Sequence, residues 1–171
     1  KKIKDYVSFS KAMQHNLRQK YANNIDSVKS KDNVVYYQHI KNVDELKAYY
    51  DNLEIKERSN SVKAMEFVFT ASPEFFEKCT QKELESWKED QVDFEKKQWG
   101  DNLQFLVLHN DEKSPHFHAV ISVEETKTHK YKNQRGEFFK KVTSLNAKKF
   151  NRDYLKKLQT DYANHNKKFG L

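Results

Sequence analysis

The sequence predicts an α+β fold in which an antiparallel sheet is covered by helices on one face. Two apolar runs, Leu103–Leu108 and Ala119–Val123, are separated by the polar turn Asn110–Pro115, so they predict a hairpin at the centre of the sheet. Segments with helical spacing lie on both sides of this hairpin. The chain has 171 residues, the length of one domain, which we place at residues 1–171.

Strands and one helix are expected before residue 71. Short strands are predicted at Asp5–Phe9 and Val34–Tyr37, and a longer strand is predicted at Ala64–Thr70, where polar and apolar residues alternate. Asn42–Tyr50 has helical spacing and begins with a capping residue. Arg58–Lys63 is polar and is expected to connect this helix to the strand at Ala64–Thr70.

Three helices are predicted after residue 71. Ser72-Pro73-Glu74 is typical of a helix start, with serine as cap and proline in the first turn. A long amphipathic helix is expected to follow, ending at Trp99-Gly100. Thr126–Gly136 is predicted to be a basic connection, and Asn151–Lys168 a last helix. The apolar face of that last helix would carry Tyr154, Leu155, Leu158 and Tyr162.

Composition limits the class of protein. Thirty-two Lys and Arg residues against twenty-five Asp and Glu give a net charge of +7, which favours a polyanionic partner. A single cysteine, Cys79, excludes an internal disulfide and a thiolate-rich zinc site, and it is compatible with a reducing compartment. No run of residues approaches the ~18 to 20 apolar residues that a membrane span requires.

Three histidines at the mouth of the central hairpin predict a metal site. Side chains alternate along a strand, so His116 and His118 project to the same face, and His109 ends the partner strand. Neutral imidazoles bind Mn²⁺, Fe²⁺, Co²⁺, Ni²⁺, Cu²⁺ and Zn²⁺, so this ligand set does not fix the metal. Three ligands leave coordination positions open for substrate or water, as in catalytic sites.

The charge around this site indicates phosphodiester chemistry. A cation held by imidazoles alone keeps its positive charge, which attracts a phosphate oxygen. Asp111 and Glu112 lie in the turn, where a carboxylate can orient a ligand imidazole. A basic DNA-binding surface is expected at Lys127, Lys130, Lys132 and Arg135, with Lys140, Lys141, Lys148 and Lys149 farther along. His39, His129 and His165 are interpreted as ordinary surface or hydrogen-bonded histidines.

Several stretches resemble the Mob/Pre plasmid mobilisation relaxases, also called the MobV relaxases. The run from His109 to His118 is similar to the metal motif of that family, His-x-Asp-Glu-x-x-Pro-His-x-His, at every named position. His15-Asn-Leu-Arg18 is similar to its His-x-x-Arg motif. Ser59–Lys78 and Ser144–Leu155 resemble the segments that lie between and after these motifs.

This resemblance implies the fold and activity of an HUH nuclease. The fold would contain a five-stranded sheet, with the metal bound by His116 and His118 and with His109 as the third ligand. The activity would be nicking of one strand at a plasmid origin of transfer, with covalent attachment to the 5′ phosphate and later rejoining. His15 would be the nucleophile and form a phosphoramidate, Arg18 would hold a phosphate, and Glu112 would orient His15 or a ligand.

The same resemblance predicts the cofactor and the partners. We expect a divalent metal, Mn²⁺ first and Mg²⁺ or another divalent ion as alternatives. The partner would be origin-of-transfer DNA in single-stranded or hairpin form, in the bacterial cytoplasm. The chain is expected to be part of a longer protein whose carboxy-terminal region forms a homodimer.

Two other functions stay open. A replication initiator nickase would use a tyrosine as nucleophile, for which Tyr154, Tyr36 and Tyr37 are the candidates. A catalytically silent module would bind origin DNA, with the metal organising a phosphate pocket. A cupin-like metalloenzyme also places His-x-His on a strand, but its glycine-framed motif is poorly reproduced in a chain with three glycines.

Overall fold

The computed structural model describes residues 1–20 and 23–171, and its centre is a five-stranded antiparallel sheet. The strand order is β1-β3-β5-β4-β2, so the predicted hairpin β4–β5 lies within the sheet and β5 is its middle strand. The α+β class and the five-stranded sheet are therefore confirmed. The strands are β1 (Lys2–Ile3), β2 (Val34–Gln38), β3 (Ala64–Thr70), β4 (Leu103–His109) and β5 (His116–Ser122).

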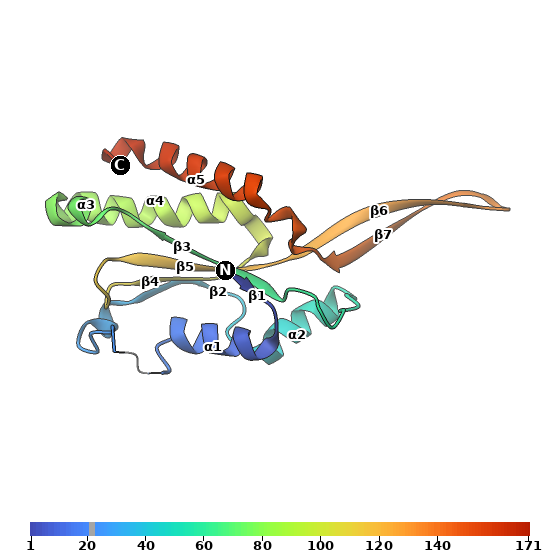
Figure 1. Cartoon of the computed structure of the whole chain (residues 1–171), viewed down its shortest axis with the longest axis horizontal. Coiled ribbons are helices and arrows are strands. Elements are labelled where there is room, and N and C mark those ends of the chain that lie inside the picture. Colours follow the sequence, from blue (N-terminus) through green and yellow to red (C-terminus); the bar gives the residue numbers. More distant parts are fainter. Residues whose placement is uncertain (21–22) are drawn as a thin grey trace.

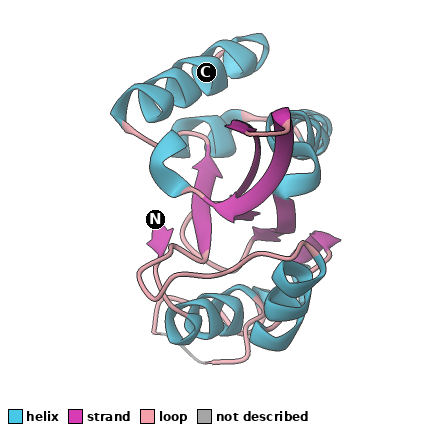
Figure 2. Ribbon diagram, turned by 90° about the vertical axis from the view of Figure 1, so that its right-hand side faces the viewer, coloured by secondary structure: helices cyan, strands magenta, loops and turns pink. Residues whose placement is uncertain are grey.

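Helices cover both faces of the sheet, whereas the sequence led us to expect helices on one face only (Figures 1 and 2). One face is covered by α1 (Tyr6–Asn16) and α2 (Val43–Asn52). The other is covered by α3 (Pro73–Lys78), α4 (Gln81–Trp99) and α5 (Arg152–Asn166). Short 3₁₀ turns occupy Lys29–Asp32, Gly100–Asn102, Ala147–Lys149 and Lys167–Phe169.

The two apolar faces of the central strands explain this three-layer arrangement. Every residue of β4 is buried. Leu106 and Leu108 pack in the cluster under α4 and α5, while Phe105 and Val107 pack in the cluster under α1 and α2. A strand that is apolar on both faces must be covered on both faces to bury that surface.

The segment Asp5–Phe9, predicted to be a strand, forms the start of helix α1 instead. The Asp5 carboxylate accepts a hydrogen bond from the Ser8 backbone amide at 2.7 Å and caps the helix. Phe9, Ala12 and Met13 then share one buried helix face. Helical spacing and the cap together outweigh the β propensity of the first residues.

The predicted connection Thr126–Gly136 is also wrong, because a β-hairpin occupies this region and projects beyond the sheet (Figure 1). We call residues 124–145, which form β6 (Glu124–Asn133) and β7 (Gly136–Leu145), the arm. Nearly all arm residues are exposed or half-buried, so no apolar alternation signals the strands. Gly136 has φ +125°, a conformation that favours glycine at the tight turn.

The helices otherwise begin near the predicted residues. Ser72 caps α3, which ends at Lys78, and a capping box of Thr80 and Glu83 starts α4. The α4 helix ends at Trp99, as expected, with Gly100 at positive φ. On α5, Leu155 is 39% exposed, so it is not part of the apolar face to which we assigned it. Along the described part of the chain, no helix is long and apolar enough to span a membrane.

Glu95 of α4 is a fully buried carboxylic acid that should cost stability at neutral pH. Both carboxylate oxygens lack a hydrogen-bond partner within the described residues. Burial raises the pKa of Glu95 well above its ordinary value, so the unfolded chain loses this proton at lower pH than the folded protein. The free energy of unfolding should therefore fall as pH rises above the ordinary glutamate pKa.

We accordingly expect Glu95→Leu to stabilise the protein by about 1–3 kcal/mol at neutral pH and to reduce this pH dependence. Urea unfolding at pH 4 to 8 measures both effects, with Glu89→Leu as the exposed control on the same helix. A variant that is less stable than the parent across this range would contradict the assignment.

Candidate functional site

Four histidines from three elements meet at one end of the sheet, on the α1 face. His109 ends β4 and pairs directly with His116 at the start of β5, and His118 follows two residues later on the same face. His15 comes from the last turn of α1. The ring centroids of His109, His116 and His118 lie 4.8–5.4 Å apart, and that of His15 lies 5.7 Å from His109 and 5.4 Å from His118.

Hydrogen bonds on the outer side of each ring leave one nitrogen of each of the three hairpin histidines available. His109 Nε2 lies 3.0 Å from the Asn16 carbonyl, His116 Nδ1 lies 2.8 Å from the Ser114 carbonyl, and His118 Nδ1 lies 3.2 Å from Glu66 Oε1. These oxygens can only accept, so the protons are assigned to these nitrogens. The remaining nitrogens carry lone pairs, and His109 Nδ1 is buried without a hydrogen-bond partner among the described residues.

The available nitrogens of these histidines are of the kind that binds a divalent metal ion. Metal-binding histidines typically donate their second N–H to a carbonyl or carboxylate, as all three do here. Two sets of side chains bring their ligand atoms within 4.8 Å of one another: His15, His109 and His118 form one set, and His109, Glu112 and His116 form the other. Neither set contains all three predicted ligands, His109, His116 and His118, but both contain His109, so potential ligands converge around its ring.

Burial favours the neutral form of three of these imidazoles, those of His109, His116 and His15. It lowers the pKa of His109 to about 3 and also lowers the pKa values of His116 and His15. Burial alone would raise the pKa of Glu66, but hydrogen bonds from His118 and Asn16 hold it at about 2. Neutral rings and an ionised carboxylate are the protonation states that metal binding requires.

Arg18 binds two carboxylates of the turn between β4 and β5. Its Nη2 donates to Asp111 Oδ1 at 2.6 Å and to Glu112 Oε1 at 2.8 Å, and its Nε donates to Asp111 Oδ2 at 2.9 Å. Asp111, whose side chain is fully buried, also accepts from Ser30 and Asn33. The pKa of Asp111 stays far below its ordinary value because these hydrogen bonds outweigh the effect of burial.

The end of α1 explains how Arg18 reaches this position. Arg18 has φ +53°, a left-handed conformation in which a side chain other than glycine costs about 1 kcal/mol or more. Its backbone amide donates to the His15 carbonyl at 3.0 Å, just beyond the end of the helix at Asn16. Its Nη1 lies 3.4 Å from His15 Nε2. The sequence predicts that this guanidinium holds a phosphate, but Asp111 and Glu112 occupy most of its donors.

Glu112 lies between two histidines of the cluster. Its Oε1 is 3.9 Å from His15 Nε2 and 3.8 Å from His116 Nε2, and Arg18 and Asn24 hold the carboxylate in place. Sequence reasoning missed Glu66, which binds His118. The signal available was a single carboxylate within the otherwise uncharged strand Ala64–Thr70.

Two of the three candidate tyrosines pack on the face of the sheet opposite the histidine cluster. Tyr154 packs in the apolar cluster under α4 and α5, on the opposite face of the sheet, and its hydroxyl accepts from Gln98 and Trp99. Tyr36 packs against Phe117 and the same cluster. Tyr37 lies on the edge strand β2 and is 37% exposed.

The predicted basic residues lie far from the histidines. Lys127, Lys130, Lys132 and Arg135 belong to the arm, which extends from the end of the sheet opposite the β4–β5 turn (Figure 1). About six residues separate His118 from the start of the arm, roughly 20 Å at the rise of a strand. Lys127 pairs with Glu125 at 3.2 Å, and Lys130 pairs with Glu137 at 2.6 Å.

Sequence comparison identifies relatives of this chain. Residues 1–168 match the family model Mob_Pre, described as plasmid recombination enzyme. A plasmid recombination enzyme of Bacillus thuringiensis is 37% identical over 67 residues, 39% of this chain and 15% of that protein. A 65 kDa protein of Zymomonas mobilis is 32% identical over 117 residues, 67% of this chain and 18% of that protein. The chain thus spans less than a fifth of the length of these curated relatives.

Solved structures share the fold. A Mn-bound MobM relaxase domain in complex with oriT DNA of plasmid pMV158 matches with a TM-score of 0.75 and 21% identity, over 100% of this chain and 84% of that chain. A second MobM relaxase domain, bound to 26-nucleotide oriT DNA, matches with a TM-score of 0.63 and 20% identity, over 99% of this chain and 84% of that chain. With a family model that matches nearly its whole length, the chain belongs to the Mob_Pre family of plasmid recombination enzymes.

Proposed function

We propose that residues 1–171 form the catalytic domain of a relaxase that nicks one strand at a plasmid origin of transfer and keeps the 5′ phosphate on His15. The observation that carries this proposal is the contact of the neutral His15 ring with a cluster of three imidazoles whose available nitrogens can hold a metal. Family membership and the oriT DNA bound by the MobM relaxase domain support the same function.

The metal would be held by His109 through Nδ1 and by His116 and His118 through Nε2, the nitrogens left available by the outer hydrogen bonds. When bound, a divalent ion neutralises charge on a phosphate and makes its phosphorus more electrophilic. We propose Mn²⁺, which the MobM relaxase domain contains, with Mg²⁺ or another divalent ion as the alternative.

His15 would supply the nucleophile. A ring nitrogen of the neutral imidazole has a lone pair and forms a bond to phosphorus, while the bond from phosphorus to the 3′ oxygen breaks. The 3′ oxygen leaves and takes a proton, and the histidine loses its ring proton. The products are a 3′ hydroxyl and a phosphoramidate in which the ring is neutral and the phosphoryl group keeps one negative charge. Rejoining is the reverse attack by a 3′ hydroxyl, which conserves the phosphoryl bond energy.

Arg18 and Glu112 would position His15. Glu112 Oε1 lies 3.9 Å from His15 Nε2 and is fixed by Arg18, so this carboxylate would orient the ring through its charge. Arg18 Nη1 donates to the His15 carbonyl at 3.3 Å and is free of the two carboxylates, so its second N–H would donate to a phosphate oxygen beside the nucleophile. The two roles that we propose for Arg18, positioning and phosphate binding, would therefore use different nitrogens.

The DNA would extend from the histidine cluster to the arm. Lys127, Lys130, Lys132 and Arg135 would bind its phosphates with little discrimination among bases. The arm also exposes Tyr131, Phe138 and Phe139, whose rings are available for base stacking. Contacts of these two kinds are typical of proteins that bind single-stranded DNA.

A nicking assay tests the proposed function. Supercoiled plasmid that carries the cognate origin is incubated with the protein and Mn²⁺, then denatured and separated. We expect relaxed plasmid with protein attached to one end, and loss of the product when EDTA removes the metal. Relaxed plasmid without attached protein, or equal nicking of a plasmid that lacks the origin, would contradict the proposal.

Glu66 should determine how tightly the metal binds. Its carboxylate orients His118 and makes the ring a stronger donor, so Glu66→Gln is expected to weaken Mn²⁺ binding about tenfold or more. Isothermal titration calorimetry measures the affinity, and Glu125→Gln in the arm is the matched control. Unchanged Mn²⁺ affinity in a folded Glu66→Gln protein would show that this carboxylate does not act on the metal site.

A further inference from the structure

A large cavity lies away from the histidine cluster, at the base of the arm. Its volume is about 1060 Å³, and it lies between the segment that follows α2 and strand β7. We call it the basal cleft. Its charged lining residues are Glu54, Lys56, Glu57, Arg58, Lys127, Lys140, Lys141 and Lys148.

The basal cleft has a large excess of positive charge. Six of these side chains are cationic and two are carboxylates, and the Glu57 carboxylate already binds Lys63 and the Tyr6 hydroxyl. Lys140, Lys141 and Lys148 form no ion pair with any described residue, and the same is true of Lys56 and Arg58. Unpaired cations gathered around one cavity create a field that attracts a polyanion.

A hydrogen-bond network fixes the start of the arm, and with it the arm side of the cleft, relative to the sheet. Glu124, at the start of β6, accepts from Tyr49 of α2 at 2.7 Å, from Asn102 at 2.7 Å and from Ser122 at 3.0 Å. Asn146, which lines the cleft, donates to Glu125. The cleft therefore keeps a defined distance from the histidine cluster, roughly 20 Å along β5.

We propose that the basal cleft binds the phosphodiester backbone of the same DNA molecule, about six nucleotides from the scissile phosphate at the 3.4 Å spacing of a duplex strand. This inference rests on the proposed function, because it assumes that DNA occupies the histidine cluster. Charge complementarity identifies the ligand: the lining is dominated by lysine and arginine, which suits a chain of phosphates better than an apolar ligand. The exposed rings of the adjoining arm complete a surface for DNA.

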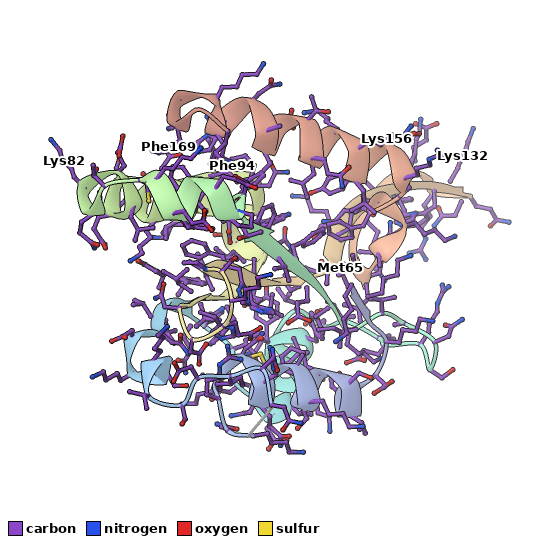
Figure 3. The ribbon with its side chains drawn as sticks, turned by 60° about the vertical axis from the view of Figure 1, so that its left-hand side comes forward. Met65, Lys82, Phe94, Lys132, Lys156 and Phe169 are labelled. Atoms are coloured by element: carbon purple, nitrogen blue, oxygen red, sulfur yellow. The ribbon has the colours of Figure 1, made fainter. Side chains whose placement is uncertain are left out.

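The dependence of DNA affinity on salt tests this proposal without any cleavage. The cleft variant Lys140→Ala/Lys141→Ala/Lys148→Ala is compared with a control variant, Lys82→Ala/Lys97→Ala/Lys167→Ala. The control removes the same charge from exposed lysines of the helical layer, of which Lys82 is labelled in Figure 3. Fluorescence anisotropy measures binding of mixed-sequence DNA of about 20 base pairs, and of about 20 single-stranded nucleotides, lengths that span both sites.

Loss of three phosphate contacts is expected to reduce the slope of log affinity against log salt by about 2.7 for duplex DNA or about 2.1 for a single strand. For duplex DNA, the affinity loss between 50 and 200 mM salt should then shrink by roughly 40-fold. The probe that shows the change tells whether the cleft binds duplex or single-stranded DNA. With an oligonucleotide of about three nucleotides, too short to bridge the two sites, the cleft variant should change the affinity far less.

Equal slopes for the cleft and control variants with both long probes would overturn the proposal, because the cleft lysines would then act only through net charge. This outcome is independent of the chemistry at His15. A protein that never forms an adduct but shows the expected change in slope would refute the proposed function and leave the cleft assignment standing.

Discussion

Replacement of His15 by alanine is expected to abolish the covalent protein–DNA adduct and to lower the nicking rate by roughly 10³-fold or more, because the variant lacks the attacking nitrogen. His15 lies at the end of α1 with its side chain 39% exposed, so its truncation should leave the fold and DNA binding intact. A denaturing gel of end-labelled origin DNA measures the adduct, and anisotropy measures DNA binding.

Tyr154→Phe is the matched control for His15→Ala. It removes a hydroxyl that accepts from Gln98 and Trp99 on the opposite face of the sheet, so it should keep full nicking activity. An adduct that persists in His15→Ala but disappears in Tyr154→Phe would assign the chemistry to a tyrosine, as in a replication initiator. Absence of an adduct in all variants and in the parent protein would favour a catalytically silent origin-binding module.

Removal of Arg18 should have the largest effect on stability. Arg18→Ala would leave the buried Asp111 carboxylate with only Ser30 and Asn33 as donors, and we expect a loss of about 3 kcal/mol in the free energy of unfolding. Urea unfolding of the metal-free protein measures the loss. Arg58→Ala, which removes an exposed arginine with no ion pair among the described residues, should change stability by less than about 0.5 kcal/mol.

A double variant distinguishes the cost of an unpaired buried carboxylate from the cost of losing the packing of the Arg18 side chain. Asp111→Ala in the Arg18→Ala background removes the unpaired carboxylate, so it should recover part of the lost stability. The alternative is that Asp111→Ala lowers the free energy of unfolding by the same amount in the Arg18→Ala background as in the parent protein. That result would show that the two side chains are not coupled and that the ion pair does not stabilise the site.

The sequence predicted the parts of the fold whose residues show a clear pattern. The runs Leu103–Leu108 and Ala119–Val123 are apolar enough to identify buried strands, and Asn42 and Ser72 identify helix starts. The arm was missed because its strands are exposed on both faces and are held by ten backbone pairs instead of by burial. Helix coverage of the second face follows from long-range packing of α1, which depends on the Asp5 cap that we did not recognise.

The site was predictable where it is local and not where it depends on contacts between distant segments. Alternation along a strand was sufficient to bring His116 and His118 together with His109. His15 entered only through a family resemblance, because nothing in its own segment places α1 against β5. The contact of Glu66 with His118 depends on the β3–β5 register, which no local pattern specifies.

The chemical nature of the protein–DNA bond tests the central claim most directly. The adduct is formed on end-labelled origin DNA in Mn²⁺ and isolated under denaturing conditions. One portion is treated with mild acid and another with mild base, and release of the labelled DNA is measured in each. A third portion is digested, and mass spectrometry identifies the peptide that carries the DNA. A phosphoramidate of His15 should release the DNA in acid, survive in base, and map to the peptide that contains residue 15. A bond that survives acid and maps to a peptide containing a tyrosine would contradict the account.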